Sequence, residues 1–500
     1  MEFVDNLAIG FGVAMTPANL GFAFLGAMVG TLIGVLPGIG PIATIAMLLP
    51  LTFHLEPLSG LIMLAGIFYG AQYGGSTTAI LVNLPGETSS VMTCLDGHQM
   101  ARQGRAGAAL AVAALASFFA GCIATALIAA FAPPLAKIGQ SFGAPEYFSL
   151  MLLGLVAAVV LAHGSIVKAV AMIVLGLLVG LVGTDGNTGG TRFTFDIREL
   201  TDGIDVATLA IGLFGVGEVI SNLARPEEQR SVIAEKITRL WPTGDDVRRS
   251  WRAVLRGTAL GSILGVLPGG GATLSSFAAY ALEKKMSREP QRFGRGAVEG
   301  VAAPESANNA GAQTSFIPML TLGIPGNAVM ALMIGALTIH GIQPGPQIMS
   351  ERPQLFWGMV ASMWIGNLML VIINLPLIGI WVQLLKVPYR FLYLAILLFC
   401  AIGVYTVNNS SAAVLLAAFF GVVGFVLMRL DCEPAPMILG FVLGPLMEEN
   451  LRRAMKIASG DPMIFVQRPI SLGLLIAAAL LLLVVALPAI RGKREEVFQG

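Results

Sequence analysis

Four short breaks containing proline and glycine interrupt long apolar stretches of this chain, at residues 36–40, 84–87, 267–271 and 324–327. Proline removes a backbone donor and glycine weakens a helix, so we expect a helix to stop at each break. The helix that restarts after a break presents free N–H groups and the positive end of its dipole, which bind anions. The helix that ends before a break exposes carbonyl oxygens, which suit a hard cation such as sodium.

Polar residues gather beside these breaks. Unpaired polar groups are costly in lipid, so as a group they are expected to face a cavity. For any single hydroxyl, the alternative is a bond that joins two helices. The residues that we assign to substrate binding are Pro37, Gly38, Gly40, Ser76, Thr77, Thr78, Asn83, Pro85, Gly86, Pro268, Gly269, Gly270, Thr273, Asn309, Thr314, Pro325, Gly326 and Asn327.

The residues that we assign to cation binding or coupling are Glu87, Gly75, Glu305, Asn308 and Thr321. Glu87 and Glu305 are the sharpest of these, because a carboxylate near a break can ligate a cation or take a proton. The alternative for both is an interfacial acid in water. No paired carboxylates, Ser-His-Asp pattern or His-x-x-x-His motif appears, so we expect no enzyme activity.

The composition predicts the elements that position these residues. The chain has 500 residues, of which 56% are hydrophobic and 12% are charged, and its mean hydropathy is +0.80. Charged residues average about 25% in soluble domains. Apolar segments of membrane-spanning length recur along the chain. We therefore predict an all-α polytopic membrane protein with about 10–12 membrane segments. The net charge of +1 gives no sign of nucleic-acid binding, and the absence of a P-loop argues against an ATP-driven pump.

An internal repeat organises the chain. Gly-Val-Leu-Pro-Gly occurs at 34–38 and again at 265–269, and Leu84-Pro85-Gly86 is echoed by Ile324-Pro325-Gly326. We predict an N-terminal transmembrane repeat (1–224), a basic cytoplasmic connector (225–256) and a C-terminal transmembrane repeat (257–500). The repeat offset grows from 231 to 240 residues, which places an insertion at the charged residues 283–295.

The segment 254–282 has basic residues on both flanks. By the positive-inside rule, both flanks would be cytoplasmic if the break at 267–269 formed the tip of a re-entrant hairpin. A straight but kinked span is the alternative, because glycine and proline also occur in ordinary membrane helices. Since this choice changes the span count, the sequence leaves open whether the two halves are parallel or inverted. Residues 184–205 mix charges and are expected on the outer side.

The ordered combination of motifs resembles the large membrane subunit of the tripartite tricarboxylate transporters. The resemblance extends from about residue 21 to 487, and its motifs are the two pentapeptides and residues 70–87, 183–186, 299–310 and 321–326.

The resemblance implies the translocating subunit of a bacterial secondary importer in the inner membrane. It also implies two partners, a small membrane subunit and a periplasmic solute-binding protein. The substrates would be small carboxylates, such as citrate, other tri- and dicarboxylates or aromatic acids. The coupling ion would be Na⁺ or H⁺, with no other cofactor. Two other readings stay open: a stand-alone carboxylate carrier and a passive channel.

Overall fold

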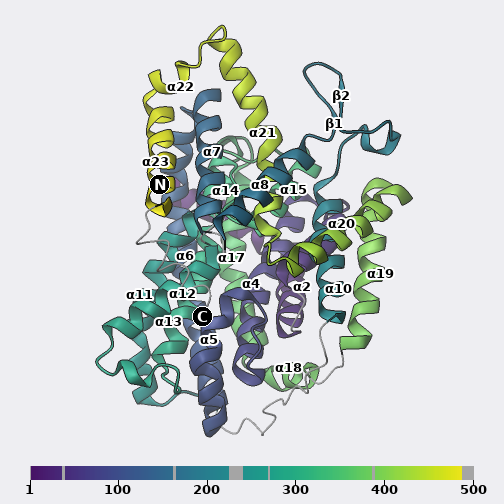
Figure 1. Cartoon of the computed structure of the whole chain (residues 1–500). Helices are drawn as coiled ribbons and strands as arrows, with labels where there is room; N and C mark the ends of the chain where they lie inside the picture. Colours follow the sequence, from purple (N-terminus) through teal and green to yellow (C-terminus); the bar gives the residue numbers. More distant parts are fainter. Residues whose placement is uncertain are drawn as a thin grey trace.

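The structure is a computed structural model that describes residues 2–36, 40–161, 165–224, 240–267, 271–385 and 389–486. Almost every ordered element is a helix (Figure 1). The first half contains α1 (Glu2–Ala14), α2 (Pro17–Val35), α3 (Pro41–Thr52), α4 (Pro57–Val82), η1 (Thr88–Ser90), α5 (Val91–Thr93), η2 (Cys94–His98), η3 (Ala101–Arg105), α6 (Ala106–Gly139), α7 (Ala144–Leu161), α8 (Ile166–Gly180), β1 (Gly183–Thr184), β2 (Thr191–Arg192), η4 (Arg198–Leu200), α9 (Val206–Ala210), η5 (Ile211–Val216) and α10 (Gly217–Leu223).

The second half contains α11 (Gly244–Val266), α12 (Gly271–Met286), η6 (Pro290–Arg292), α13 (Glu299–Thr314), α14 (Phe316–Leu322), α15 (Ala328–Ile339), α16 (Gln347–Glu351), α17 (Pro353–Asn374), α18 (Ile378–Leu384), α19 (Tyr389–Asn408), α20 (Ser411–Arg429), α21 (Ala435–Ile457), α22 (Ile464–Gln467) and α23 (Pro469–Ala486). Within the described residues, five helices are long and apolar enough to cross a membrane: Pro17–Val35, Ala101–Gly139, Val206–Leu223, Pro353–Asn374 and Ser411–Arg429. The predicted all-α polytopic membrane fold is confirmed.

Glycines let α2 and α4 approach until their backbones touch. A Cβ atom built on Gly30 would lie 2.3 Å from the carbonyl oxygen of Ile67, so only glycine fits. The same distance recurs one turn before and after: the three contacts are Gly26 to Met63, Gly30 to Ile67 and Gly34 to Ala71. Because both series rise together, α2 and α4 run parallel. Small residues at this spacing are a common way to pack helices in membranes.

The same packing recurs 231 residues later, between α11 and α13. A Cβ atom on Gly261 would lie 2.3 Å from the carbonyl oxygen of Ala307. The three contacts are Gly257 to Ala303, Gly261 to Ala307 and Gly265 to Gly311. The repeat seen in the pentapeptide thus extends to a glycine stripe along the helix that precedes it. The boundaries of the two repeats stay a prediction.

The two halves are inverted relative to each other. Ser76 of α4 donates a hydrogen bond to Glu305 of α13, and the Tyr69 ring lies against the Phe316 ring, with centroids 6.0 Å apart. An earlier residue of α4 therefore meets a later residue of the second half, so α4 and α13 run antiparallel. Since each is parallel to its own glycine-stripe helix, the two helix pairs point in opposite directions.

Helices α11 and α12 form a hairpin. Arg256 pairs with Glu283 at 2.5 Å, and Arg249 pairs with Glu289 at 3.1 Å. The start of α11 therefore lies beside the end of α12, which requires the two helices to run antiparallel. This arrangement agrees with the hairpin alternative and not with a straight span. The turn at residues 268–270 lies outside the described residues.

Part of the predicted connector is helical. Residues 244–256 are the first half of α11 and do not form a loop. The helix begins here because Thr243 and Asp246 form a reciprocal capping box. Residues 225–239 lie outside the described residues. The predicted insertion agrees with the longer loop of the second half, since residues 53–56 join α3 to α4 while 287–298 join α12 to α13.

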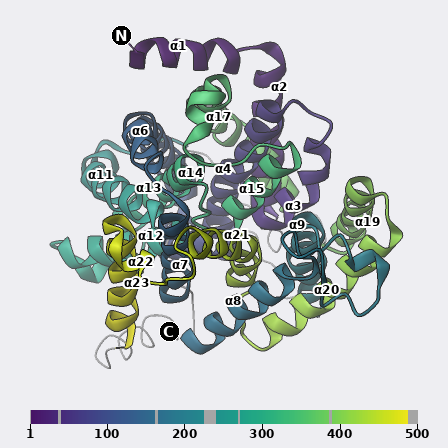
Figure 2. The same cartoon turned by 90° about the horizontal axis from the view of Figure 1, so that it is seen from above.

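One long helix from each half packs against the central helices of the other half. Helix α6 packs against α13, where Thr125 donates to Gln313 and Asn309 donates to Ser117. Helix α17 packs against α2 and α4, and its last residue, Asn374, donates to Thr31. Figure 2 shows α1 at the outer edge of the bundle, near α2 and α17, and α19, α20 and α8 on another side.

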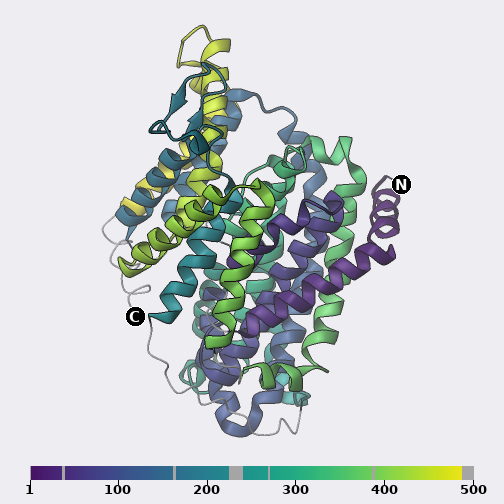
Figure 3. The same cartoon turned by 90° about the vertical axis from the view of Figure 1, so that its right-hand side faces the viewer.

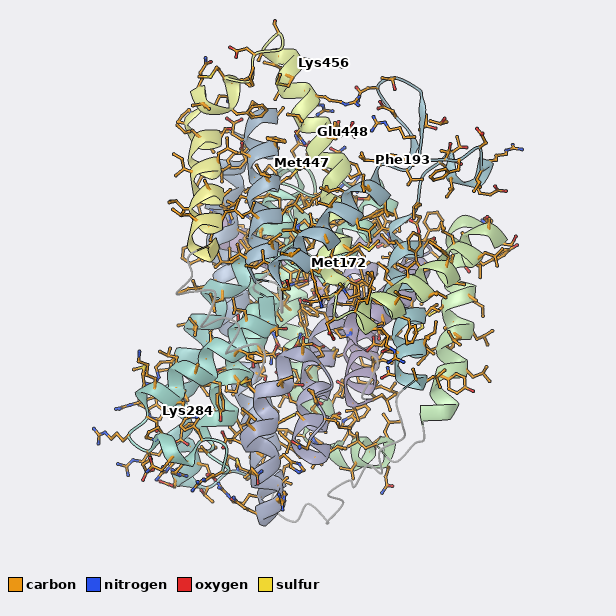
Figure 4. The ribbon with its side chains drawn as sticks, in the orientation of Figure 1. Met172, Phe193, Lys284, Met447, Glu448 and Lys456 are labelled. Carbon is orange, nitrogen blue, oxygen red and sulfur yellow. The ribbon has the colours of Figure 1, made fainter. Side chains whose placement is uncertain are left out.

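The loop that contains β1 and β2 and the end of the α11–α12 hairpin lie at opposite ends of the molecule. Figure 4 places Phe193 at one end and Lys284 at the other, and Figure 3 shows β1 and β2 projecting beyond the bundle. Arg192 pairs with Asp185 and Glu448, so ion pairs hold the loop against α21. Hydrogen bonds from the Asn187 backbone and from Arg192 and Thr188 hold the pKa of Asp185 well below its usual range. The membrane side of each end stays a prediction.

We expect Gly30→Ala to destabilise the protein, because the added methyl group would meet the Ile67 carbonyl. Overpacking costs about 1–3 kcal/mol, whereas Gly→Ala at an open helix position stabilises by roughly 0.5–1 kcal/mol. Gly21 is the matched control, since it lies in the same helix and a Cβ there meets nothing within 4 Å. Thermal unfolding in detergent should show a lower midpoint for Gly30→Ala only. Equal midpoints for the two variants would contradict the close approach.

Candidate functional site between the two halves

The centre of the polar cluster is the carboxylate of Glu305, which is 1% exposed in the middle of α13. Three hydroxyls surround it. Ser76 of α4 donates to Oε2 at 2.7 Å, Thr93 of α5 donates to Oε1 at 2.5 Å, and Ser117 of α6 lies 3.4 Å from Oε2. No ion pair to Glu305 occurs within the described residues. Elements from both halves thus hold one acid in a buried, uncharged environment.

A small cavity lies beside Glu305. Its polar lining consists of Tyr73, Ser76, Thr77, Ser117, Glu305 and Asn374, and aliphatic side chains complete the wall. The cavity volume is about 10 Å³, which is close to the room that one water molecule needs. The Tyr73 hydroxyl and Asn374 Oδ1 are buried without a hydrogen-bond partner among the described residues. This conformation therefore leaves no room for a carboxylate substrate beside Glu305.

A second polar group surrounds Glu87, directly after the break at 84–86. The Ser89 hydroxyl lies 2.9 Å from Gln72 Oε1 and 3.2 Å from Glu87 Oε2. Beside it, Thr88 and Thr273 join the two halves through hydroxyls 3.0 Å apart, at an exposed position. This pair lies where the first half's second break meets the start of α12, so the two predicted break regions are neighbours in space.

The breaks pack backbone against backbone. A Cβ on Gly86 would lie 2.3 Å from the carbonyl oxygen of Gly34 and 2.5 Å from Cα of Gly75, so these three predicted residues meet at one point. In the second half, Gly326 faces the Gly265 carbonyl, with its Cβ position 3.9 Å away. Gly271, with a φ of 43°, lies beside the side chain of Asn327.

Several predicted residues instead satisfy backbone groups. Thr78 donates to the Val35 carbonyl at 2.8 Å, which covers an oxygen that the end of α2 leaves free. Thr314 and Thr321 donate to carbonyls of the preceding turn, and Asn327 caps α15 through the Met330 N–H. Gly40 caps α3. The side chains of Thr78, Thr314, Thr321 and Asn327 therefore make structural hydrogen bonds to backbone groups, and none of these bonds points to a substrate.

The remaining predicted residues are placed as follows. Asn83 ends α4 in the left-handed conformation, with φ of 58°, and Pro85 follows it on the surface, whereas Pro325 is buried. Asn308 is fully buried, and neither amide atom has a partner among the described residues. Pro37, Gly38, Pro268, Gly269 and Gly270 lie outside the described residues.

Sequence reasoning missed four residues of the Glu305 cluster: Tyr73, Thr93, Ser117 and Asn374. Ser117 and Asn374 lie in long apolar helices far from any break, and only the exchange of α6 and α17 between halves brings them here. Ser117 stands in an alanine-rich run and Asn374 in an aliphatic one. An isolated polar residue in a membrane helix was the available signal.

A second buried carboxylate fastens the two halves at the hairpin end. Asp96 accepts hydrogen bonds at Oδ1 from the backbone N–H groups of Gly294, Gly296 and Ala297, at 2.8–2.9 Å, and at Oδ2 from the Tyr280 hydroxyl at 2.9 Å. Gly294 and Gly296 have φ of 80° and 98°, which few other residues adopt. Successive N–H groups aimed at one anion form a nest, so Asp96 holds the 287–298 loop in place.

Comparison with known proteins identifies the family. Residues 20–439 match the tripartite tricarboxylate transporter TctA family. The chain belongs to this family. An Agrobacterium vitis protein, described as an uncharacterized 52.8 kDa protein in the TAR-I ttuC' 3' region, is 58% identical over 498 residues, covering 100% of this chain and 99% of that protein. Another from the same organism, an uncharacterized protein in the TAR-II ttuC' 3' region, is 58% identical over 238 residues, covering 48% of this chain and 98% of that protein. No solved structure matches the chain.

As a TctA family member, the protein is a multi-pass membrane component of a tripartite transporter, a system that has partner subunits. The polar cluster between the inverted halves has two parts, a small cavity at Glu305 and an exposed hydroxyl pair at Thr88 and Thr273.

We expect Asp96→Ala to lower the stability of the protein, because three backbone N–H groups would lose their common acceptor. Each buried polar group left unpaired costs about 1–3 kcal/mol. Asp202→Ala is the control, since Asp202 is exposed in the loop that precedes α9. Thermal unfolding should give a midpoint several degrees lower for Asp96→Ala alone. A midpoint like that of the control would mean that the nest does not fasten the loop.

Proposed function

We propose that this protein is the translocating subunit of a cation-coupled secondary importer for small carboxylates, in the bacterial inner membrane. The observation that carries the proposal is the buried carboxylate of Glu305, which has no ion-pair partner among the described residues, between two inverted, break-containing halves. A charge kept away from water and from any ion pair is expensive, so its retention favours a role in ion coupling. Family membership supplies the transport context.

The carboxylate substrate docks at the exposed break region and not in the small cavity. The Thr88 and Thr273 hydroxyls bond to each other in this conformation and can turn to donate to a carboxylate, and the start of α12 presents backbone N–H groups and the positive end of its dipole. Such a site binds an anion without an arginine. Tri- and dicarboxylates such as citrate, together with aromatic acids, are the substrate classes to test.

Two partners complete the proposed system: a small membrane subunit and a periplasmic solute-binding protein that delivers the substrate. The family supports this arrangement through its tripartite organisation. In the proposed cycle, the hairpin-bearing parts move relative to the rest and expose the substrate site to each side in turn. The repeated and inverted packing of α2 with α4 and of α11 with α13 supports two such parts.

Uptake into proteoliposomes tests the proposed function. We expect labelled citrate, or another member of a carboxylate panel, to accumulate above its outside concentration only under an inward Na⁺ or H⁺ gradient, because a coupled carrier draws on that gradient. The protein should be assayed with and without the small subunit and the binding protein. Accumulation without the binding protein would replace the tripartite assignment by a stand-alone carrier. Equilibration without accumulation under every gradient would point to a channel.

The hydroxyl pair gives a second prediction. Thr88→Val and Thr273→Val should each raise the KM for uptake by about 3- to 10-fold, the effect of losing one hydrogen bond of roughly 0.5–1.5 kcal/mol. If both hydroxyls hold one substrate, the double variant should differ from the product of the single effects. Thr338→Val is the control, because its hydroxyl donates to the Ile334 carbonyl of its own helix. Unchanged KM values for both single variants would remove this pair from the substrate site.

A further inference from the structure

We infer that the cavity beside Glu305 is a binding site for one sodium ion, formed by oxygen atoms of Glu305, Ser76, Ser117, Tyr73 and Asn374. This inference rests on the proposed function and names the ion that it couples. It also moves the cation site away from most of the residues that the sequence indicated, since Gly75, Glu87 and Thr321 do not line the cavity.

The donor set consists of oxygen atoms. Glu305 supplies a carboxylate, Ser76 and Ser117 supply hydroxyls, and Asn374 lines the cavity and has a buried amide oxygen with no donor among the described residues. The Asn309 side-chain amide donates to the Ser117 hydroxyl oxygen at 2.7 Å and to the backbone carbonyl of Glu305 at 3.1 Å, which holds the Ser117 hydroxyl in place. Hard cations prefer carboxylate, carbonyl and hydroxyl oxygens, whereas softer metals select nitrogen or sulfur.

The charge of the site favours a monovalent ion. Among the described residues, Glu305 is the single carboxylate that lines the cavity, and no cationic side chain lines it. One bound monovalent cation would therefore neutralise the pocket, while a divalent cation would leave a buried positive charge. Uncompensated charge in a low-dielectric interior costs several kcal/mol. The volume of about 10 Å³ admits one small, desolvated ion and excludes a hydrated one.

The unpartnered oxygens favour a bound ion over protonation of Glu305 as the way to neutralise the cavity. Protonation would neutralise the acid but would leave Asn374 Oδ1 without a partner, and buried polar atoms without partners are rare. A water molecule could bridge the oxygens but would leave the carboxylate charge in place. A proton on Glu305 and a water molecule would be needed together to meet both requirements, whereas one sodium ion meets both alone. The ligands come from α4, α6, α13 and α17, so binding would join helices of both halves.

Thermal unfolding of the purified full chain tests the inference without substrate or partners. The midpoint of the wild type should rise with NaCl and saturate, relative to choline chloride at equal ionic strength and pH, because an ion that binds only the folded state stabilises it. Glu305→Gln keeps the shape and one acceptor oxygen, replaces the other oxygen by an NH₂ group and removes the charge. It should lose the sodium response and should unfold no earlier than the wild type in choline chloride.

A ligand variant and a matched control sharpen the test. Ser117→Ala should raise the half-saturating sodium concentration by about tenfold, as expected for one lost ligand of about 1.4 kcal/mol. Ser149→Ala makes the same change at a buried serine of α7 that bonds to Ser471, and it should respond to sodium like the wild type.

Two results would overturn the inference. One is a wild-type midpoint that is the same in sodium and choline, including the case in which lower pH alone stabilises the protein. The other is a sodium response that survives in Glu305→Gln. Because no transport is measured, the two proposals can fail separately. Sodium stabilisation with no partner-dependent uptake would reject the importer alone, whereas proton-driven uptake without sodium stabilisation would reject the sodium site alone.

Discussion

Placing backbone and carboxylate groups inside an apolar bundle is the constraint on which the rest of this structure depends. Each helix that stops at a break leaves N–H or carbonyl groups without partners, and lipid offers none. The structure meets this demand with protein. Thr78 covers the carbonyl that ends α2, Asn327 caps α15, and Gly86 brings one break directly against the backbone of another. The glycine stripes make such close packing possible.

The inverted arrangement places unlike parts of the two halves side by side. Helix α12 of the second hairpin contacts the segment that follows the second break of the first half, through Thr273 and Thr88. In the other direction, α3, which occupies the place of α12 in the first repeat, packs against α15, which follows the last break. Helices α3 and α12 are therefore each bordered by the other half, and a movement of either one changes contacts between the halves.

Much of the fold could be predicted because its signals are local. The break motifs, the apolar stretches and the repeat offset all lie within short windows of sequence, and the α11–α12 hairpin follows from basic residues on both flanks. The relative orientation of the two halves, parallel or inverted, could not be predicted, because it depends on how α4 packs against α13. That contact, between Ser76 and Glu305, joins residues 229 positions apart. The helix at residues 244–256 was not predicted, because arginines on a helix surface give the same sequence pattern as a polar loop.

The candidate site was predictable only where it borders a break. Ser76, Thr77, Asn309 and Glu305 lie near the motifs and gather as expected, but hydroxyl identity alone could not separate cavity residues from structural ones. Thr78 is next to Thr77, yet it bonds to the α2 backbone while Thr77 lines the cavity. On a helix, neighbouring residues point about 100° apart, and only the packing of α2 on one side of α4 decides which side meets the cavity.

Helices α6 and α17 each pack on the opposite half, and this crossing places helices of both halves around Glu305. Ser117 reaches the acid from a first-half helix that packs on the second-half core, and Asn374 reaches the cavity from a second-half helix that packs on the first-half core. Whatever neutralises Glu305 therefore acts on contacts that tie both halves together. A charge left bare would favour separation of these helices and entry of water, whereas a compensated charge would favour closure. Thr93, which donates to Glu305, lies five residues after Thr88, so a short segment joins the buried acid to the exposed break region where Thr88 meets Thr273.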